Sequence, residues 1–276
     1  MALLEARGLS VRYGGLFANN SIDLECRAGQ LVGLIGPNGA GKTTFIDAIT
    51  GFTPVSSGEV VFDGVNLNDK APNVRVALGL SRTFQSLELF EDLTVRDNLL
   101  VVAQRPKWHS VVTDVLWPGR DERKYHSQVR WALEMLQIES LAEAMPSDLS
   151  HGQRKLISVA RSIVAKPQLV LLDEPAAGLD TAESHLLGER LRGLLAQDMS
   201  LFLIDHDMGL VLNVCDYIYV LDFGVIIAHG TPSEVRANPT VIAAYLGDSA
   251  GEAQAREGAA LLSRESGSDA QSEMNQ

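Results

Sequence analysis

Residues 31–44 read Leu-Val-Gly-Leu-Ile-Gly-Pro-Asn-Gly-Ala-Gly-Lys-Thr-Thr, and this stretch decides the fold class. It opens with an apolar run, and residues 36–43 then match the pattern G-x-x-x-x-G-K-S/T at every fixed position. The stretch predicts a buried strand, a glycine-rich loop and a helix that begins at Lys42. Such a loop points successive backbone N–H groups at an anion, and the helix N-terminus adds about half a positive charge.

The loop is a candidate cradle for the phosphate groups of a nucleotide. In that role Lys42 would reach the β- and γ-phosphates, and Thr43 would hold Mg²⁺. The alternative is a glycine-rich turn with an incidental lysine, and the strand before it and the helix after it argue against this. The residues expected to bind the nucleotide here are Gly36, Pro37, Asn38, Gly39, Ala40, Gly41, Lys42, Thr43 and Thr44.

Two acidic residues follow a second apolar run, residues 169–172. A buried parallel strand of this type delivers side chains to the sheet edge where ligands bind in open α/β folds. Asp173 would then contact the shell of Mg²⁺, and Glu174 would polarise the attacking water as a general base. Acids are also common at solvated strand ends, but the phosphate loop favours the catalytic interpretation.

The composition restricts the class of partner. The chain has 276 residues, 46% of them hydrophobic, and 35 acidic against 23 basic residues give a net charge of −12. This charge argues against wrapping a nucleic-acid backbone. Cys26 and Cys215 are expected to be reduced thiols. No signal-peptide pattern and no apolar run of about 20 residues is present in the sequence, so a membrane function would need another chain to supply the span.

The predicted elements change character along the chain. The first part combines short strands with one helix, at residues 4–9, 21–25, 30–35, 42–50 and 59–62. Helical stretches come next, at residues 95–103, 122–136 and 153–165. Strands and helices then alternate again, at residues 169–172, 182–195, 200–204, 217–221, 225–228 and from Thr231 onward. Residues 248–276 are rich in small and acidic residues and are expected to form a disordered acidic tail.

Residues 149–153, Leu-Ser-His-Gly-Gln, precede the third helical stretch. A serine hydroxyl, a glycine backbone and a helix N-terminus suit an anion, although an ordinary serine N-cap shows the same pattern. Together with the phosphate loop and the two acids, this stretch resembles the nucleotide-binding domain of ABC transporters, over residues 4–247. The resemblance implies that Ser150, Gly152 and Gln153 contact the ATP bound to the opposite subunit, and His151 departs from the usual glycine of the motif.

The resemblance also implies a fold. It is an α/β fold with a P-loop NTPase (RecA-like) core, an antiparallel β subdomain and an inserted helical subdomain. Residues 1–247 would form the nucleotide-binding domain, with the helical subdomain at about residues 87–165.

Further single residues take roles from the same resemblance. Gln85 matches a glutamine that touches Mg²⁺ or water and senses the membrane subunit. His206 matches a histidine that contacts the γ-phosphate, although a lone histidine is more often structural. Tyr13 matches an aromatic residue that stacks on adenine, with a half-buried tyrosine at a strand end as the alternative. Residues 177–180 resemble the loop that crosses the interface between two subunits.

Several stretches resemble the ATP-binding subunits of branched-chain amino acid importers, namely residues 82–85, 89–95, 205–208 and 243–247. Asp205 stands where that group usually has glutamate. The implied function is an ATP-hydrolysing subunit, with ATP and Mg²⁺ as cofactors, at the cytoplasmic face of the membrane. The implied partners are a second ATP-binding subunit, identical or paralogous, integral membrane permeases and, indirectly, a solute-binding protein.

The sequence is also compatible with other functions. Relatives that carry urea, amides or lipids share the same chemistry. A non-transport ABC ATPase acting on DNA or ribosomes usually has a coiled-coil insertion, paired cassettes or a basic arm, and the sequence shows none of these. A nucleotide-sensing module without turnover is a further alternative, and the presence of both Glu174 and His206 argues against it.

Overall fold

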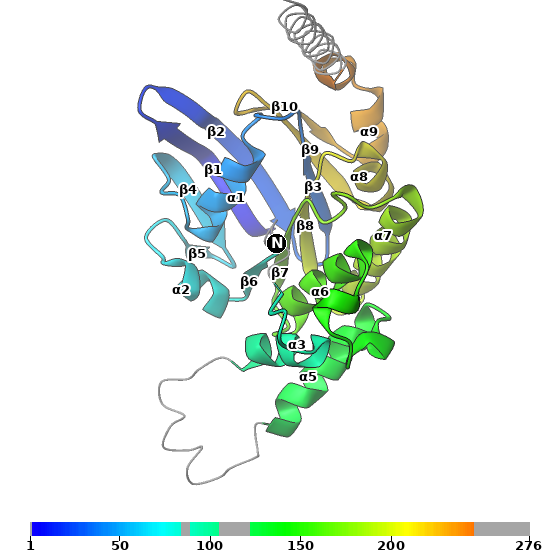
Figure 1. The fold of residues 1–276 in the computed structure, drawn as a ribbon. Helices are drawn as coiled ribbons and strands as arrows, with labels where there is room; N and C mark the ends of the chain where they lie inside the picture. The colour runs from blue at the N-terminus through cyan, green and yellow to red at the C-terminus, as the bar shows by residue number, and fades with distance from the viewer. Residues whose placement is uncertain (1, 84–88, 105–121, 246–276) are drawn as a thin grey trace, which may run out of the picture.

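The computed structural model describes residues 2–83, 89–104 and 122–245 (Figure 1). The described part contains two sheets with helices around them. The smaller sheet is antiparallel and has the order β2-β1-β4-β5. Its strands are β1 (Ala2–Tyr13), β2 (Leu16–Arg27), β4 (Ser57–Phe62) and β5 (Val65–Asn66).

The larger sheet has six strands in the order β10-β9-β3-β8-β7-β6. All its neighbouring pairs are parallel except β9 with β10, which form an antiparallel hairpin. The strands are β3 (Leu31–Ile35), β6 (Leu80–Arg82), β7 (Leu169–Asp173), β8 (Ser200–Ile204), β9 (Tyr217–Asp222) and β10 (Val225–Gly230). This strand order brings the carboxyl ends of β3, β7 and β8 together at the same end of the sheet, although the three strands are far apart in sequence.

The helices fall into two groups. Those associated with the sheets are α1 (Lys42–Thr50), α2 (Pro72–Ala77), α7 (Thr181–Leu195), α8 (Met208–Val214) and α9 (Pro232–Ala237). Those of the middle segment are α3 (Val95–Ala103), α5 (Glu122–Met135), α6 (His151–Ile163) and the short 3-10 helices Glu139–Leu141 and Pro146–Asp148. In Figure 1 α3 and α5 lie together beyond the lower end of the central sheet.

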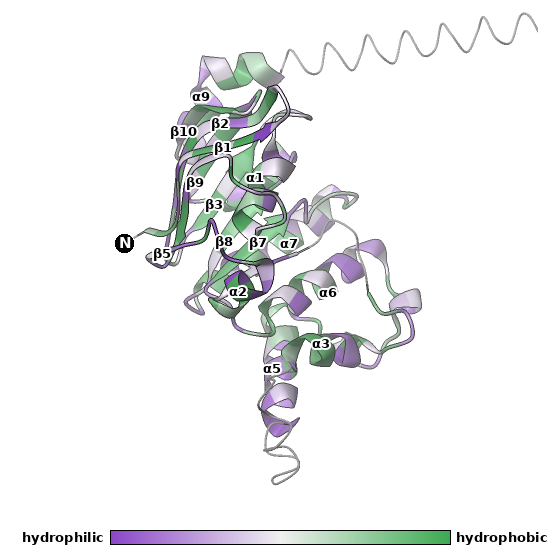
Figure 2. Cartoon of the chain, turned by 90° about the vertical axis from the view of Figure 1, so that its left-hand side faces the viewer, coloured by the Kyte–Doolittle hydropathy of each residue, from purple (hydrophilic) through white to green (hydrophobic). Residues whose placement is uncertain are grey.

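Alternating residues of the central strands build two separate cores. On β3, Leu31 and Ile35 pack with the helical side, whereas Val32 and Leu34 pack with α1 and the antiparallel sheet. Because strands β3, β7 and β8 are buried on both faces, they are apolar throughout, which is typical of parallel strands covered by helices. Figure 2 shows this hydrophobic colour concentrated on the central strands.

The predicted fold class is confirmed, and several element boundaries differ from the expectation. Strands β1 and β2 are 12 residues each, because their antiparallel pairing continues to a tight turn at Gly14 and Gly15. Helix α6 begins at His151, two residues before the expected start, since Ser150 caps it. Helices α2 and α8 were not predicted, because each is too short to show a helical period. The expected tail lies outside the described residues.

Candidate functional site

The phosphate loop connects β3 to α1. The sequence dictates its shape, because its glycines approach other backbone segments too closely for a side chain. A Cβ on Gly36 would lie 2.0 Å from the carbonyl oxygen of Leu221, and one on Gly41 would lie 2.4 Å from that of Ala18. Gly41 is also the N-cap of α1, with φ of 105°. The loop is therefore held by the β9–β10 hairpin on one side and by β2 on the other.

Lys42 is the first residue of α1 and is only 7% exposed. Its ammonium group folds back over the loop and donates hydrogen bonds to the carbonyl oxygens of Gly36 at 2.6 Å and Pro37 at 2.9 Å. The positive charge is thus held directly beside the backbone that an anion would approach.

A cleft opens over this loop, and Glu174 contributes to its wall. The lining residues are Phe17, Ala18, Asn38, Gly39, Ala40, Gly41, Lys42, Thr43, Thr44, Glu174, Phe223 and Gly224. The structure therefore brings most of the predicted phosphate-binding residues and the predicted general base to one cleft. Pro37 lines an adjoining hollow together with Ala243 and Ala244.

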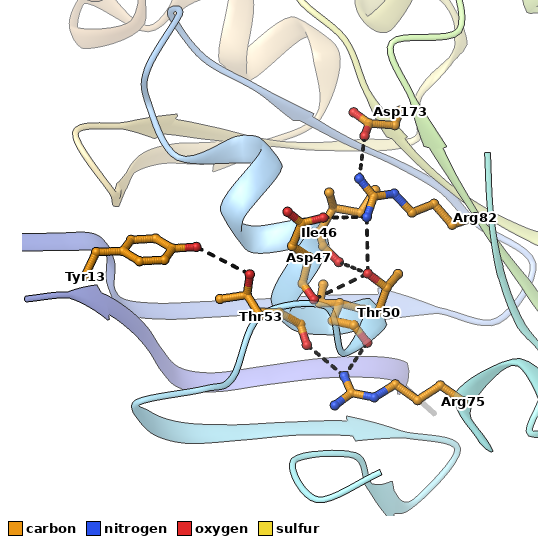
Figure 3. A network of polar contacts seen from close by, with 10 residues as sticks. Tyr13, Ile46, Asp47, Thr50, Thr53, Arg75, Arg82 and Asp173 are labelled. Atoms are coloured by element: carbon orange, nitrogen blue, oxygen red, sulfur yellow. Dashed lines mark hydrogen bonds and ion pairs between the residues drawn. The ribbon is translucent and has the colours of Figure 1, made fainter. Parts of the chain in front are cut away.

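Asp173 ends strand β7 and is buried, with 5% of its surface exposed. Its Oδ2 accepts a hydrogen bond of 2.8 Å from Nη2 of Arg82, and its backbone N–H donates to the hydroxyl of Thr83 at 3.1 Å. Arg82 also reaches Asp47 and Thr50 of helix α1 (Figure 3). Prediction from the sequence assigned Asp173 but missed the arginine that holds it.

Glu174 and His206 follow the neighbouring strands β7 and β8. The backbone N–H of Glu174 donates to the carbonyl of Ile204 at 2.7 Å, and Glu174 has a φ of 47°, an uncommon value for a residue other than glycine. Nδ1 of His206 lies 3.8 Å from Oε1 of Glu174. Lys155 of α6 donates to the backbone carbonyl of Glu174 at 3.0 Å, and burial lowers the pKa of Lys155.

Asp205 is a further buried acid beside this pair, with no exposed surface. Its carboxylate accepts hydrogen bonds from the backbone N–H of Ala176 at 3.1 Å and of Asp207 at 3.0 Å. Burial raises the pKa of Asp205, and the two backbone N–H groups oppose that shift. The side chain ties the segment after β7 to the segment after β8. The sequence shows Asp205 only as a departure from the usual glutamate.

The residues predicted to contact the ATP of the opposite subunit line a different cleft. Ser150 caps α6, with its hydroxyl accepting from the backbone N–H of Gln153 at 3.2 Å, while the Gln153 side chain accepts from the N–H of Ser150 at 2.9 Å. Ser150, Gly152 and Gln153 line a hollow with Leu179 and Glu183, away from the residues that line the phosphate-loop cleft.

His151 links the segment 149–153 to the loop before α7. Its Nε2 lies 3.2 Å from the carbonyl oxygen of Ala177, and a Cβ on Gly178 would lie 2.9 Å from the same nitrogen. The residue that departs from the motif therefore contacts residues 177–180, which were predicted to cross a subunit interface.

Of the remaining predicted site residues, Tyr13 does not line the cleft, and Gln85 lies outside the described residues. Tyr13 lies at the end of β1, is 56% exposed, and its hydroxyl is 3.4 Å from that of Thr53. It is not among the residues that line the phosphate-loop cleft, whereas Phe17 is, beneath the guanidinium of Arg12 at 5.5 Å. Gln85 lies outside the described residues, so its predicted role stays a prediction.

The strand, loop and helix, with acids at the neighbouring strand end, define a nucleotide-binding P-loop domain. The family described as ABC transporter matches residues 19–177, and the family described as branched-chain amino acid ATP-binding cassette transporter matches residues 225–251. The chain belongs to the ABC transporter family. It is an ATP-binding cassette, an ATPase coupled to transport.

Individual relatives agree with this assignment. The chain is 38% identical to the high-affinity branched-chain amino acid transport ATP-binding protein LivG of Salmonella typhimurium, over 89% of this chain and 98% of that protein. It is 35% identical to the corresponding protein BraF of Pseudomonas aeruginosa, with the same coverage. The ADP conformation of MJ1267, an ATP-binding cassette of an ABC transporter, superposes with a TM-score of 0.79 at 29% identity, over 90% and 99% of the two chains.

Family membership implies membrane permease partners and a dimer of cassettes. Among the described residues, no helix is both long and apolar enough to cross a membrane. The same residues hold no group of three or more histidine, cysteine or acidic side chains arranged for a metal ion. The donors near the phosphate loop are instead the Thr43 hydroxyl and the Asp173 carboxylate, oxygen ligands of the type that Mg²⁺ takes alongside nucleotide phosphates.

Proposed function

We propose that this chain binds and hydrolyses ATP to power an importer of branched-chain amino acids or similar small solutes. The observation that supports ATP hydrolysis is that Glu174 lines the same cleft as Lys42, Thr43 and the loop glycines. Two comparisons support the solute class. They are the match of residues 225–251 to the branched-chain amino acid cassettes and the similarity to LivG and BraF over nearly the whole chain.

Each side chain of the cleft has a proposed task. The loop N–H groups and Lys42 hold the phosphates, and Lys42 leaves the Gly36 and Pro37 carbonyls to do so. Thr43, Asp173 and Gln85 would hold Mg²⁺, which supplies positive charge against the phosphates. Glu174 takes the proton of the attacking water, and His206 contacts the γ-phosphate from the neighbouring strand end.

The second half of each site comes from a partner cassette in this proposal. Ser150, Gly152 and Gln153 lie at the N-terminus of α6 in their own hollow, where they can receive the phosphate of an ATP held by another subunit. ATP then joins two subunits head to tail, and hydrolysis releases them. Tyr13 would stack on the adenine. Residues 1–247 would form this domain, with helices inserted at about 87–165.

The proposed setting is the cytoplasmic face of the cell membrane. There the dimer would contact integral permeases near Gln85 and the helical segment, and a solute-binding protein would deliver the solute to those permeases. Closure of the cassette dimer would then be linked to the state of the permease, so that ATP binding and transport are coupled free energies.

A strain that lacks this chain tests the proposal. We expect loss of uptake of radiolabelled leucine, isoleucine and valine, restored by the wild-type chain and not by Glu174→Gln. A tagged pull-down from detergent-solubilised membranes is expected to recover two multi-span permeases, a second ATPase and a solute-binding protein. Unchanged uptake of these amino acids, with loss of urea or amide uptake, would contradict the solute class and leave the ATPase assignment standing.

A further inference from the structure

Arg82 lies at the end of the edge strand β6, and its side chain is only 11% exposed. Its two terminal nitrogens point to two different elements (Figure 3). Nη2 donates to Oδ2 of Asp173 on β7 at 2.8 Å, while Nη1 donates to Oδ1 of Asp47 on α1 at 2.5 Å and to the hydroxyl of Thr50 at 3.3 Å. One planar guanidinium therefore joins the strand that carries Asp173 to the helix that follows the phosphate loop.

The geometry at Asp173 leaves half of its carboxylate available. Oδ2 is taken by Arg82, whereas Oδ1 has no hydrogen-bond partner among the described residues. A carboxylate that ligates a metal is usually held by hydrogen bonds from a further residue, which orient it and limit its rotation. Arg82 is placed to do this, because its fork can hold two acceptors at once, as a lysine cannot.

Two of the three proposed protein donors for Mg²⁺, Thr43 and Asp173, lie on the elements that Arg82 joins. Thr43 is in the first turn of α1, and Asp173 ends β7. Because Arg82 contacts Asp47 on the same helix as Thr43, it fixes the distance between strand and helix as well as the orientation of the carboxylate. Burial strengthens this arrangement, since ion pairs that are shielded from water are screened less by salt.

We propose that Arg82 is a positioning residue that orients Asp173 toward Mg²⁺ and sets its place relative to the phosphate-loop helix. The inference rests on the proposed function. It differs from a purely structural salt bridge in one respect, because it requires that loss of Arg82 weakens metal binding more than it weakens binding of ATP without metal. The phosphates would be held by the loop N–H groups and by Lys42, whose ammonium group lies against the carbonyl oxygens of Gly36 and Pro37.

Arg75, on α2, offers a matched control that contacts the same helix α1. It is also a buried arginine, 3% exposed, and its Nη1 donates to the carbonyls of Ala48 at 2.7 Å and Ile49 at 2.6 Å near the end of α1. It has no hydrogen bond to Asp173. Replacing it removes a buried cation that contacts α1 and leaves Thr43 and Asp173 unchanged.

The experiment compares Arg82→Gln with Arg75→Gln in the full chain. Mn²⁺ is titrated into protein held in excess over ATP and followed by electron paramagnetic resonance, and a fluorescent ATP analogue is titrated in EDTA. For Arg82→Gln we expect Mn²⁺ affinity to fall about 10- to 100-fold, with affinity for the analogue in EDTA within about threefold of wild type. For Arg75→Gln we expect Mn²⁺ affinity as in wild type, with a lower unfolding temperature.

Mn²⁺ affinity of Arg82→Gln equal to that of wild type would overturn the inference. If Arg82→Gln does not fold, Arg82→Lys serves instead. A lysine ammonium keeps the charge but cannot hold Asp47 and Asp173 together, so a smaller loss of Mn²⁺ affinity is expected and an unchanged affinity would refute the proposal. Failure of the wild-type chain to bind ATP at all would instead contradict the proposed function.

Discussion

Nδ1 of His206 lies 3.8 Å from Oε1 of Glu174, and the two residues follow neighbouring parallel strands, β8 and β7. The register pairs Asp173 with Ile204, so the segments that carry Glu174 and His206 leave the sheet at the same end. The backbone bond from Glu174 to Ile204 fixes this placement. A candidate base and a candidate phosphate contact thus lie next to each other at the same end of the central sheet.

Replacing Glu174 with glutamine tests the base. The amide keeps the shape but cannot take a proton, so we expect ATP turnover to fall about 10²- to 10⁴-fold with ATP affinity within about threefold. The ATP-bound dimer should persist in gel filtration. Glu189→Gln, at an exposed position on α7, is the control and should hydrolyse ATP normally. Normal turnover by Glu174→Gln would remove the residue from the proposed mechanism.

Lys42→Ala tests the phosphate cradle. Charge-assisted hydrogen bonds to phosphate contribute about 1.5–3 kcal/mol, so affinity for a fluorescent ATP analogue should fall roughly 10- to 100-fold. Lys166→Ala, which removes a lysine that lies over the ring of Trp131, is the control and should bind the analogue as wild type does. Equal affinity of the Lys42 variant and wild type would contradict the cradle.

Ser150→Ala separates helix capping from contact with a partner subunit. Loss of an N-cap costs about 1 kcal/mol, and both Ser150 on α6 and Thr231 on α9 form capping boxes. We therefore expect Ser150→Ala and Thr231→Ala to lower stability by similar amounts in urea unfolding. Only Ser150→Ala should weaken the ATP-dependent dimer of a Glu174→Gln background. Equal dimerisation by both variants would limit Ser150 to capping.

Burial should make both thiols unreactive in the folded chain. It raises the pKa of Cys26 to about 12 and raises the pKa of Cys215 as well. At pH 8.5 we expect neither thiol to react with a disulfide reagent until urea unfolds the protein. Above about pH 9 the unfolded chain loses thiol protons that the folded chain keeps, so this contribution to stability falls as pH rises toward 12. Rapid labelling of native protein would contradict the burial of both residues.

The phosphate loop and its flanking elements could be predicted because their signal is local. Glycines, the lysine and the apolar run specify the strand, turn and helix within 14 residues, and α1 begins and ends as expected at Lys42 and Thr50. The same holds for the strand before Asp173. The stacking role of Tyr13 stays a prediction. Phe17 lines the cleft in the structure, and local patterns do not specify side-chain direction at the β1–β2 turn, because it depends on pairing between strands.

By itself, the sequence determined the class of the protein, its phosphate loop, its two strand-end acids and the serine cap of α6. These features depend on short segments whose backbone preferences act over a few residues. Only the tertiary structure placed Arg82 between Asp173 and Asp47, tied Asp205 to Ala176, and set His151 against Ala177. Those contacts join segments up to 91 residues apart. The order of strands in the sheet, which local patterns do not specify, decides which side chains meet.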